Sequence, residues 1–410
     1  MAQVNVLDVL LYGAPIGTLT GVGGDRSLFA FNDSYIADEQ HPVLSLSFKD
    51  ALGALITDFK PTQTRVIPFF SNLLPEGHMR AYLAERAGVN PVREFFLLWV
   101  LGMDLPGAVT IRPADGEAWP PETDGASDLH DGDRRERALR FSLAGVQLKF
   151  SAVTEASGGL TIPAKGVGGS WIVKLPSRQY AAVPENEYSM MTLARMSGMD
   201  VPALELVDLR DIKNLPAEIA DLKGKALVIE RFDRLQDGTP VHIEDFAQVF
   251  GVYPDDKYQK ASMRNIAAVI AAEGEGEDDV IEFIRRLTFN MLIGNADMHL
   301  KNWSLIYPDR RRAALAPAYD FVSTVAYIKD GNSALNVSRT KRFDQFTADE
   351  LSHLAAKARL PEKIVLDTAH ETVARFRQHW NAEKRNLPLS AAVTEALDRH
   401  LQTVPLAQGT

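Results

Sequence analysis

The sequence predicts an α+β protein in which a small β-rich N-terminal part precedes a central mixed lobe and a mainly helical C-terminal half. Strand-like apolar runs dominate the first hundred residues and return between residues 141 and 232. Beyond Asp245 the apolar residues recur at helical spacing instead. An acidic tract with scattered proline and glycine separates the two strand-rich stretches, which indicates more than one domain.

The composition of the 410-residue chain is that of an ordinary globular protein. Hydrophobic residues make up 46% and charged residues 24%, which is enough for two or three packed domains. The formal net charge of −10 argues against unassisted binding to DNA or RNA, because such binding depends on clustered lysine and arginine. The absence of cysteine excludes disulfides, thiolate nucleophiles and cysteine-containing zinc sites. Since no basic leader and no membrane-length apolar stretch is present, we expect a cytoplasmic protein that does not contact a membrane.

The first part of the chain, residues 1–112, is predicted to be a small α+β domain. Strands are expected at 4–12 and 27–31, and the segment 69–77 leads into a helical pattern that continues through Arg80 and Leu83. A second apolar segment follows at 95–101. Residues 113–138 are predicted to be a linker, because they combine prolines and glycines with acidic residues and lack hydrophobic periodicity.

Residues 139–243 are predicted to form a small nucleotide-binding lobe. Strands are expected at 141–153, 171–175 and 227–232, with a helix after Pro184 that ends before Gly198. Its predicted inward face carries Tyr188, Met191 and Ala194. Residues 244–410 are predicted to be a helical lobe, with one helix ending near Gly294 and others at 348–358, 361–380 and 391–401.

An acidic residue and an amide in the helical lobe have the spacing of a phosphoryl-transfer loop. Asn302 follows Asp297 by five positions, as the metal-binding amide follows the base in protein-kinase catalytic loops. That pair alone is expected by chance about once in a chain of this length. Downstream, Asp320 lies in a short apolar context similar to the Asp-Phe-Gly metal site of kinases, although Val322 replaces the glycine. We therefore expect Asp297 to be the catalytic base and Asp320 to coordinate Mg²⁺.

A lysine in the central lobe completes the set. Lys174 lies in an apolar strand, where a buried ammonium group is costly unless a phosphate or a carboxylate pairs with it. Glu187 on the following helix is the expected carboxylate, and Glu185 is the less favoured alternative. Taken singly, Lys174 could reach solvent at a strand end and Glu187 could face water. Four such groups in kinase order favour the functional interpretation.

Neighbouring residues have weaker signals. His299 is expected to pack and to hydrogen-bond so that the loop backbone stays in place. Lys301 is expected either to neutralise the transferred phosphate or to lie solvated at the surface. No Gly-Lys-Ser/Thr phosphate loop exists, and the preferred covering loop is 142–149, ahead of the lysine strand.

These residues, in this order, resemble the HipA family of bacterial toxin kinases. The resemblance covers most of the chain, through the segments 69–77, 142–149, 171–176, 186–188, 230–234, 297–302 and 319–320. It implies a protein-kinase-like two-lobe fold that binds ATP and Mg²⁺, with Asp297 orienting the attacking hydroxyl, Asn302 and Asp320 holding Mg²⁺, and Glu187 paired with Lys174. The implied ATP-binding residues are Ala144, Gly145, Val146, Gln147, Leu148, Lys149, Lys174, Glu230, Arg231, Phe232, His299, Leu300, Lys301, Asn302, Tyr319 and Asp320.

The resemblance also implies regulation and partners. Ser142 matches the autophosphorylated serine of the family, whose modification ejects the loop and inactivates the enzyme. A small helix-turn-helix antitoxin of the HipB kind is the implied partner, through which the chain reaches operator DNA. The implied substrate is an aminoacyl-tRNA synthetase, glutamyl-tRNA synthetase foremost, so that translation stops and growth arrest or persistence follows. The other hypotheses are a catalytically idle corepressor and a small-molecule kinase.

Overall fold

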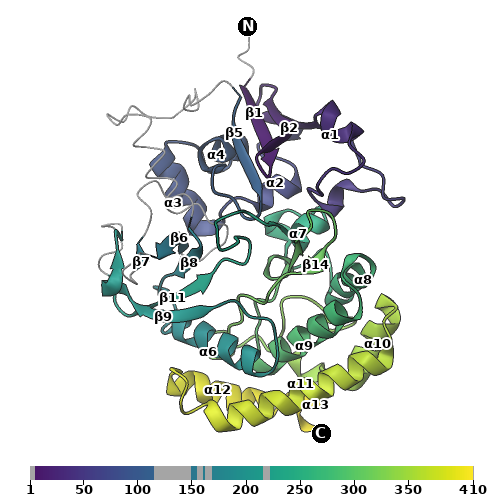
Figure 1. The fold of residues 1–410 in the computed structure, drawn as a ribbon. Coiled ribbons are helices and arrows are strands. Elements are labelled where there is room, and N and C mark those ends of the chain that lie inside the picture. The colour runs from purple at the N-terminus through teal and green to yellow at the C-terminus, as the bar shows by residue number, and fades with distance from the viewer. Residues whose placement is uncertain (1–4, 115–148, 155–159, 162–168, 216–221, 410) are drawn as a thin grey trace.

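The computed structural model describes residues 5–114, 149–154, 160–161, 169–215 and 222–409. Within these residues the chain forms three sheets and a helical half, which we call the N-terminal domain, the central lobe and the helical lobe (Figure 1). The N-terminal domain lies over the junction of the two lobes, and the last helices lie at the opposite end of the molecule. No helix in the described part of the chain is long and apolar enough to cross a membrane.

The N-terminal domain is built on a five-stranded antiparallel sheet with the order β4-β3-β2-β1-β5. Alternate residues of the first strand, Leu7, Val9 and Leu11, are buried in the core of the domain, as the period of a strand requires. The strands are β1 (Asn5–Leu11), β2 (Ala14–Gly21), β3 (Arg26–Phe31), β4 (Thr62–Gln63) and β5 (Val109–Pro113), and the helices are α1 (Asp33–Ala37), α2 (Pro68–Asn72), α3 (Gly77–Ala87) and α4 (Glu94–Leu101).

The central lobe contains a six-stranded sheet with the order β10-β7-β6-β8-β11-β9. Its strands are β6 (Lys149–Thr154), β7 (Leu160–Thr161), β8 (Trp171–Lys174), β9 (Leu204–Asp208), β10 (Ile212–Lys213) and β11 (Lys225–Glu230). Helix α6 (Val183–Met196) packs against β9 and β11. Met191 and Ala194 lie on its buried face as predicted, whereas Tyr188 is only half-buried and Met190 and Leu193 widen that face.

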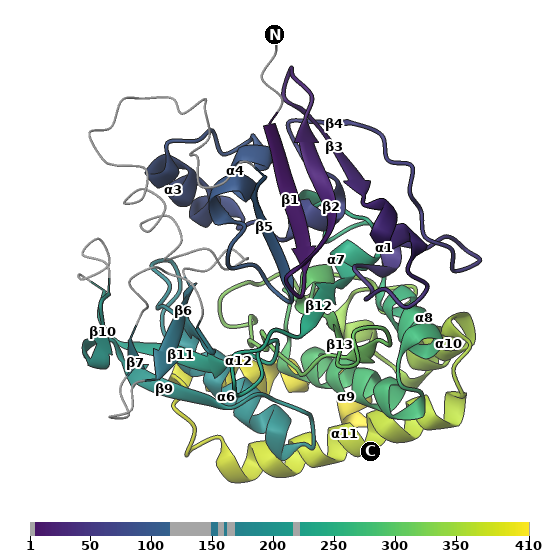
Figure 2. The same cartoon turned by 45° about the horizontal axis from the view of Figure 1, so that its top comes forward.

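The helical lobe also contains a small antiparallel sheet that the sequence did not predict, formed by β12 (His242–Asp245), β13 (Ser304–Tyr307) and β14 (Ala314–Leu315). Its helices are α7 (Phe246–Val249), α8 (Met263–Glu273), α9 (Glu277–Ile293), α10 (Ala348–Ala358), α11 (Glu362–Glu383), α12 (Ala391–Leu401) and α13 (Pro405–Gln408). Helix α9 ends at Gly294, whose φ of +64° suits a residue without a Cβ atom. The long α11 packs against both α6 and α9 (Figures 1 and 2).

Two hydrophobic cores run through the molecule, and neither coincides with one lobe. The first contains the interior of the N-terminal domain together with residues of the central sheet, such as Val173 and Val228. The second contains the interior of the helical lobe together with Met190 and Leu193 of α6. The central sheet and the helix that packs on it therefore contribute to different cores.

A buried carboxylate, that of Glu244 on β12, links the N-terminal domain to the helical lobe. The Ser45 hydroxyl and the Leu46 backbone N–H donate hydrogen bonds to it at 2.5 and 3.0 Å, and the Tyr307 hydroxyl donates from β13. Within the described residues no lysine or arginine pairs with this fully buried side chain. Burial outweighs the hydrogen bonds and raises the pKa of Glu244 to about 7.

We expect Glu244 to make the protein less stable as the pH rises from 4.5 to about 7. The folded protein keeps the Glu244 proton up to the raised pKa, whereas the unfolded chain releases it near its usual value, so the difference corresponds to roughly 3 kcal/mol of unfolding free energy. Chemical unfolding of the wild type and of Glu244→Gln at several pH values measures this, because an amide does not titrate. Between pH 4.5 and about 7 the unfolding free energy of the wild type is expected to fall by roughly 3 kcal/mol relative to that of Glu244→Gln. Equal pH dependence of the two proteins would contradict the raised pKa of Glu244.

Candidate active site

Lys174, at the end of β8, places its ammonium group between two carboxylates. Its Nζ atom forms ion pairs with Glu187 on α6 and with Asp320 in the segment after β14. Lys174 and Glu187 are buried, while Asp320 keeps 30% of its side chain exposed. The ammonium group therefore joins the central sheet, its helix and the helical lobe at one point, and Glu187 rather than Glu185 is the partner on α6.

The charged groups in this cluster shift one another's pKa values. Burial alone would lower the pKa of Lys174, but Asp320 and Glu187 outweigh it and raise that pKa above its usual value. Burial raises the pKa of Glu187, whereas the ammonium groups of Lys174 and Lys149 outweigh the partial burial of Asp320 and hold its pKa well below its usual range. Lys149 stands directly opposite Lys174 on β6, and burial next to this like charge lowers the pKa of Lys149 to about 8. Two adjacent ammonium groups favour an anionic ligand.

The segment that carries Asp320 is fixed from two sides. Asp320 has a φ of +58°, a left-handed conformation that Asp tolerates better than most residues. Its carbonyl oxygen accepts a hydrogen bond from Asn295 Nδ2 at 3.3 Å. Three residues on, Ser323 exchanges two hydrogen bonds with the side chain of Asn186 on α6, at 2.9 and 3.1 Å. The backbone at Asp320 is therefore held by both the loop after α9 and the central lobe.

Asp297 presents its carboxylate to solvent beside this cluster. Its side chain is 54% exposed, and the Tyr258 hydroxyl donates to Oδ1 at 2.7 Å. Among the described residues no donor contacts the second oxygen. The Asn295 side chain accepts a hydrogen bond from the Asp297 backbone N–H at 3.0 Å, and Asn302 Nδ2 donates to the Asp297 carbonyl at 2.7 Å. The carboxylate is thus fixed in orientation and open to an incoming hydroxyl.

His299 is buried and packs edge-on against Tyr258, with ring centroids 5.0 Å apart. Its ring does not make the expected hydrogen bond within the described part of the chain, because Nδ1 has no partner there and Nε2 lies 3.9 Å from Asp297 Oδ1. Burial, with Lys257 adding to it, lowers the pKa of His299 to about 3, so the ring is neutral at pH 7. The backbone N–H of His299, which donates to the Asp297 carbonyl at 2.8 Å, holds the loop instead.

Asn302 and Asp320 offer the oxygen donors that Mg²⁺ prefers. Asn302 donates through its nitrogen to the Asp297 carbonyl, which leaves the amide oxygen for a cation. Groups of three or more His, Asp or Glu that could hold a metal ion are absent from the residues that the structure describes. Two protein ligands fit Mg²⁺ well, because this ion usually takes its remaining ligands from substrate phosphates and water.

The predicted adenine hinge begins at the end of β11, and the side chain of its Arg231 is already engaged. Its guanidinium is buried and donates to Asp233 at 2.9 Å through two nitrogens, and to Asp104 and Ser151 at 3.3 and 3.2 Å. Arg234 contacts Asp233 and Asp104 as well. These bonds engage all three nitrogens of the Arg231 guanidinium and tie the hinge to the N-terminal domain and to β6.

Two aromatic rings meet where the hinge faces the helical lobe. Phe232 and Tyr319 lie with ring centroids 5.7 Å apart. The Tyr319 hydroxyl donates to the carbonyl of Lys301 at 3.0 Å and lies 2.6 Å from the Ser304 hydroxyl. Glu230 is exposed at the end of β11. The residues predicted to contact ATP that fall outside the described residues, together with the predicted phosphorylation site, are Ser142, Ala144, Gly145, Val146, Gln147 and Leu148.

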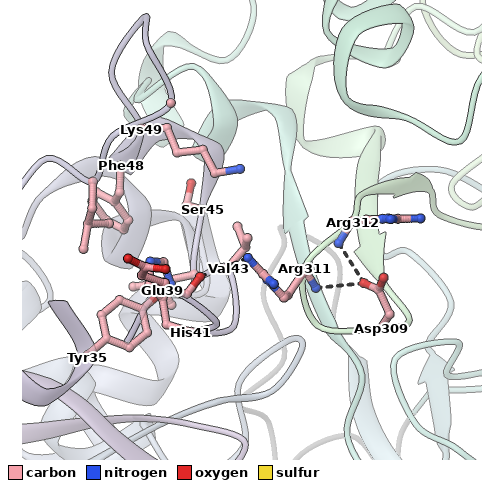
Figure 3. A pocket seen from close by; sticks show the side chains of 13 residues that line it. Tyr35, Glu39, His41, Val43, Ser45, Phe48, Lys49, Asp309, Arg311 and Arg312 are labelled. Atoms are coloured by element: carbon pink, nitrogen blue, oxygen red, sulfur yellow. Dashed lines mark hydrogen bonds between the residues drawn. The ribbon is translucent and has the colours of Figure 1, made fainter. Parts of the chain in front are cut away.

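A hollow of about 540 Å³ lies elsewhere, between the N-terminal domain and the turn before β14. Tyr35 and Lys49 line one side, and Asp309, Arg311 and Arg312 line the other (Figure 3). The backbone N–H groups of Arg311 and Arg312 donate to the Asp309 carboxylate at 2.9 and 2.7 Å. None of the predicted site residues lines this hollow, so it is distinct from the cluster around Lys174.

The fold and the site together define a two-lobed protein of the protein-kinase-like class, with a strand lysine paired to a helix glutamate. Residues 7–112 match the HipA N-terminal domain, and residues 141–380 match the HipA-like C-terminal domain. The chain belongs to the HipA family.

Known relatives extend this comparison over the whole chain. The Sinorhizobium fredii protein named "Putative kinase Y4dM" is 60% identical over 409 residues, which cover 99% of this chain and 98% of that protein. The "Serine/threonine-protein kinase toxin HipA" of Shewanella oneidensis is 26% identical over 92% of this chain and 89% of that protein. The solved complex of Shewanella oneidensis HipA with HipB and its operator DNA contains a chain with the same fold, with a TM-score of 0.71 at 23% identity, covering 98% of this chain and 99% of that chain. The predicted α+β class and the family resemblance are confirmed.

Sequence reasoning missed several residues that shape the site. Asn295 lies two positions before Asp297, so its closeness to the loop was visible, but its hydrogen bonds were not. Tyr258 precedes Asp297 by 39 positions, and no pattern in the sequence connected the two. Glu76 belongs to the segment 69–77, which the sequence marked for its resemblance without assigning it a task.

We expect Lys174→Met to reduce the unfolding free energy by about 3–5 kcal/mol, because it leaves two carboxylates without their shared cation. Chemical unfolding followed by circular dichroism measures the loss. Adding Glu187→Leu to Lys174→Met is expected to restore much of it, since the buried charge is then removed as well.

The matched control for this prediction is Lys363→Met. Lys363 forms an exposed ion pair with Asp367, and its loss is expected to change stability by less than about 1 kcal/mol. Equal changes in unfolding free energy for the two lysine substitutions would show that the buried ion pairs of Lys174 stabilise the protein no more than an exposed pair does.

Proposed function

We propose that this chain is an ATP- and Mg²⁺-dependent serine/threonine protein kinase that acts as a toxin. The observation that carries the proposal is the ammonium group of Lys174, buried between Glu187 and Asp320 and opposite Lys149. A cluster in which two lysines lie next to Asp320, the predicted Mg²⁺ ligand, suits the binding of nucleotide phosphates. The names of the relatives, kinases and a kinase toxin, support the same reaction class.

The residues would divide the work of phosphoryl transfer. Lys174 and Lys149 would bind the phosphates, while Asp297 accepts the proton of the attacking hydroxyl and orients it, with Tyr258 fixing the carboxylate. Asn302 and Asp320 would hold Mg²⁺, which when bound neutralises charge on the phosphates.

We expect Asp297→Asn to lower phosphate transfer by about a hundredfold or more, because the amide cannot accept the hydroxyl proton. The assay is incubation of the purified protein with γ-labelled ATP, Mg²⁺ and a cell lysate, read by gel autoradiography. Removal of Mg²⁺ by a chelator is expected to abolish the signal as well. Asp367→Asn, an exposed acid far along the chain, is the matched control and is expected to transfer at the wild-type rate.

The same assay separates this proposal from its rivals. Label on a protein of synthetase size supports an aminoacyl-tRNA synthetase as substrate, with glutamyl-tRNA synthetase as the first to test. Label confined to a metabolite would instead indicate a small-molecule kinase. No transfer by protein that mass spectrometry shows to be unphosphorylated would indicate a catalytically idle corepressor.

We also propose autophosphorylation at Ser142 as the off-switch and a HipB-like antitoxin as the partner that carries the chain to operator DNA. The net charge of −10 supports indirect rather than direct DNA contact. Ser142→Ala is expected to lose self-labelling, because it has no hydroxyl at this position. It is expected to keep transferring phosphate to the lysate protein, because no phosphate is added that could inactivate it. Retained self-labelling at the wild-type level would place the modification elsewhere.

A further inference from the structure

The segment 69–77 of the N-terminal domain makes polar contacts with the helical lobe. The carbonyl of Phe69 accepts a hydrogen bond from Gln248 Nε2 on α7 at 3.1 Å. Asn72, which is buried, donates through Nδ2 to the carbonyl of Val252 at 2.7 Å. Helix α2 accordingly lies beside α7 at the junction of the two parts (Figures 1 and 2). The segment is therefore docked at both its first and its middle residues.

Its penultimate residue, Glu76, reaches further and contacts two lysines of the helical lobe. One carboxylate oxygen lies 2.7 Å from Lys257 Nζ and the other lies 2.6 Å from Lys301 Nζ. All three side chains are at most 12% exposed, and Lys301 also donates to the carbonyl of Asn72 at 3.0 Å. The two lysines outweigh burial and lower the pKa of Glu76 to about 2, so the carboxylate is charged at neutral pH.

Both lysines belong to segments that meet at Asp297. Lys257 directly precedes Tyr258, the donor to the Asp297 carboxylate, and its carbonyl accepts a hydrogen bond from the Leu300 backbone N–H at 3.3 Å. Lys301 lies between His299 and the predicted metal ligand in the loop that begins at Asp297. A movement of either lysine would therefore move a group that touches Asp297.

We propose that Glu76 is a positioning residue that the N-terminal domain supplies to the catalytic loop: it holds Lys257 and Lys301 in place and thereby fixes Tyr258 and Asp297. This inference rests on the proposed kinase function. Two ammonium groups bound to one carboxylate repel each other when that carboxylate is removed, and in a buried site the repulsion is weakly screened. The loop at Asp297 then rearranges, whereas the ion pairs of Lys174 with Glu187 and Asp320 use no atom of Glu76 or of its two lysines.

The decisive comparison is between Glu76→Gln and Glu94→Gln. Glu94 is a buried carboxylate of the same domain, but its partners Arg80, Ser71 and Val66 all lie within that domain. Both substitutions neutralise a buried carboxylate of the N-terminal domain, but only that of Glu76 pairs with lysines of the helical lobe. Initial rates of labelled phosphate transfer at varied ATP concentration give kcat and KM for each protein, and thermal unfolding gives its stability.

We expect Glu76→Gln to lower kcat by about tenfold or more, because misplaced catalytic groups reduce the rate steeply, and to leave KM for ATP within about threefold of the wild type. Glu76→Asp keeps the charge on a shorter side chain, so its kcat is expected to lie between those of the wild type and Glu76→Gln. Glu94→Gln is expected to retain kcat even where its loss of stability is equal. Unchanged kcat in Glu76→Gln, or an equal fall in Glu94→Gln, would overturn the positioning role.

A second readout does not depend on kinase activity. Acetylation by acetic anhydride, followed by mass spectrometry, is expected to be several-fold faster at Lys257 and Lys301 in Glu76→Gln, because both amines lose the carboxylate that pairs with them. Lys363 at the surface is expected to react equally in all proteins. Absence of transfer in the wild type would contradict the proposed function alone, whereas unchanged reactivity of Lys257 and Lys301 would contradict the contact with Glu76 itself.

Discussion

The positive charge of Lys174 is almost completely removed from water, and the arrangement of the side chains around it follows from how that charge is compensated. An ammonium group in such a place is stable only if carboxylates approach it closely, and here Glu187 and Asp320 do so from two different elements. The strand, the helix and the segment after β14 cannot separate without uncovering a charge. The hydrogen bonds of Asn186, Asn295 and Ser323 then set the backbone around this point and leave the carboxylate of Asp297 at its open side.

Patterns with a local cause could be predicted from the sequence. The helices at 348–358 and 391–401 begin and end at the predicted residues because caps and periodicity are encoded nearby, and the pairing of Lys174 with Glu187 follows from a short strand-helix connection. Contacts between distant segments carry no such signal. Glu76 meets Lys301 across more than 200 residues, and the side chain of Arg231 pairs with Asp104 across more than 100. The ring of His299 lacks its expected hydrogen bond within the described residues and packs against Tyr258, which no pattern indicated.

The N-terminal domain is joined to both lobes by charged or ionisable side chains. Ser45 and Leu46 of this domain donate hydrogen bonds to Glu244. Its Asp104 pairs with Arg231 and Arg234, and its Glu76 pairs with two lysines of the helical lobe. Each of these contacts pairs one part of the chain with another, and those of Asp104 and Glu76 involve the predicted hinge and the loop at Asp297. A partner that moved this domain would therefore act on the predicted hinge and on the proposed catalytic loop together.

Because the central lobe is divided between two hydrophobic cores, we do not expect it to fold as a separate fragment. A fragment containing only the sheet and α6 would expose one apolar surface that the N-terminal domain normally covers and another that the helical lobe covers. Such a fragment is expected to aggregate or to bind chaperones, even though it contains the lysine, the glutamate and the hinge. Ribosomal synthesis meets the same difficulty, since the sheet emerges before α9 and α11 exist to cover α6. The central lobe of the nascent chain must therefore stay incompletely packed until the last helices have left the ribosome.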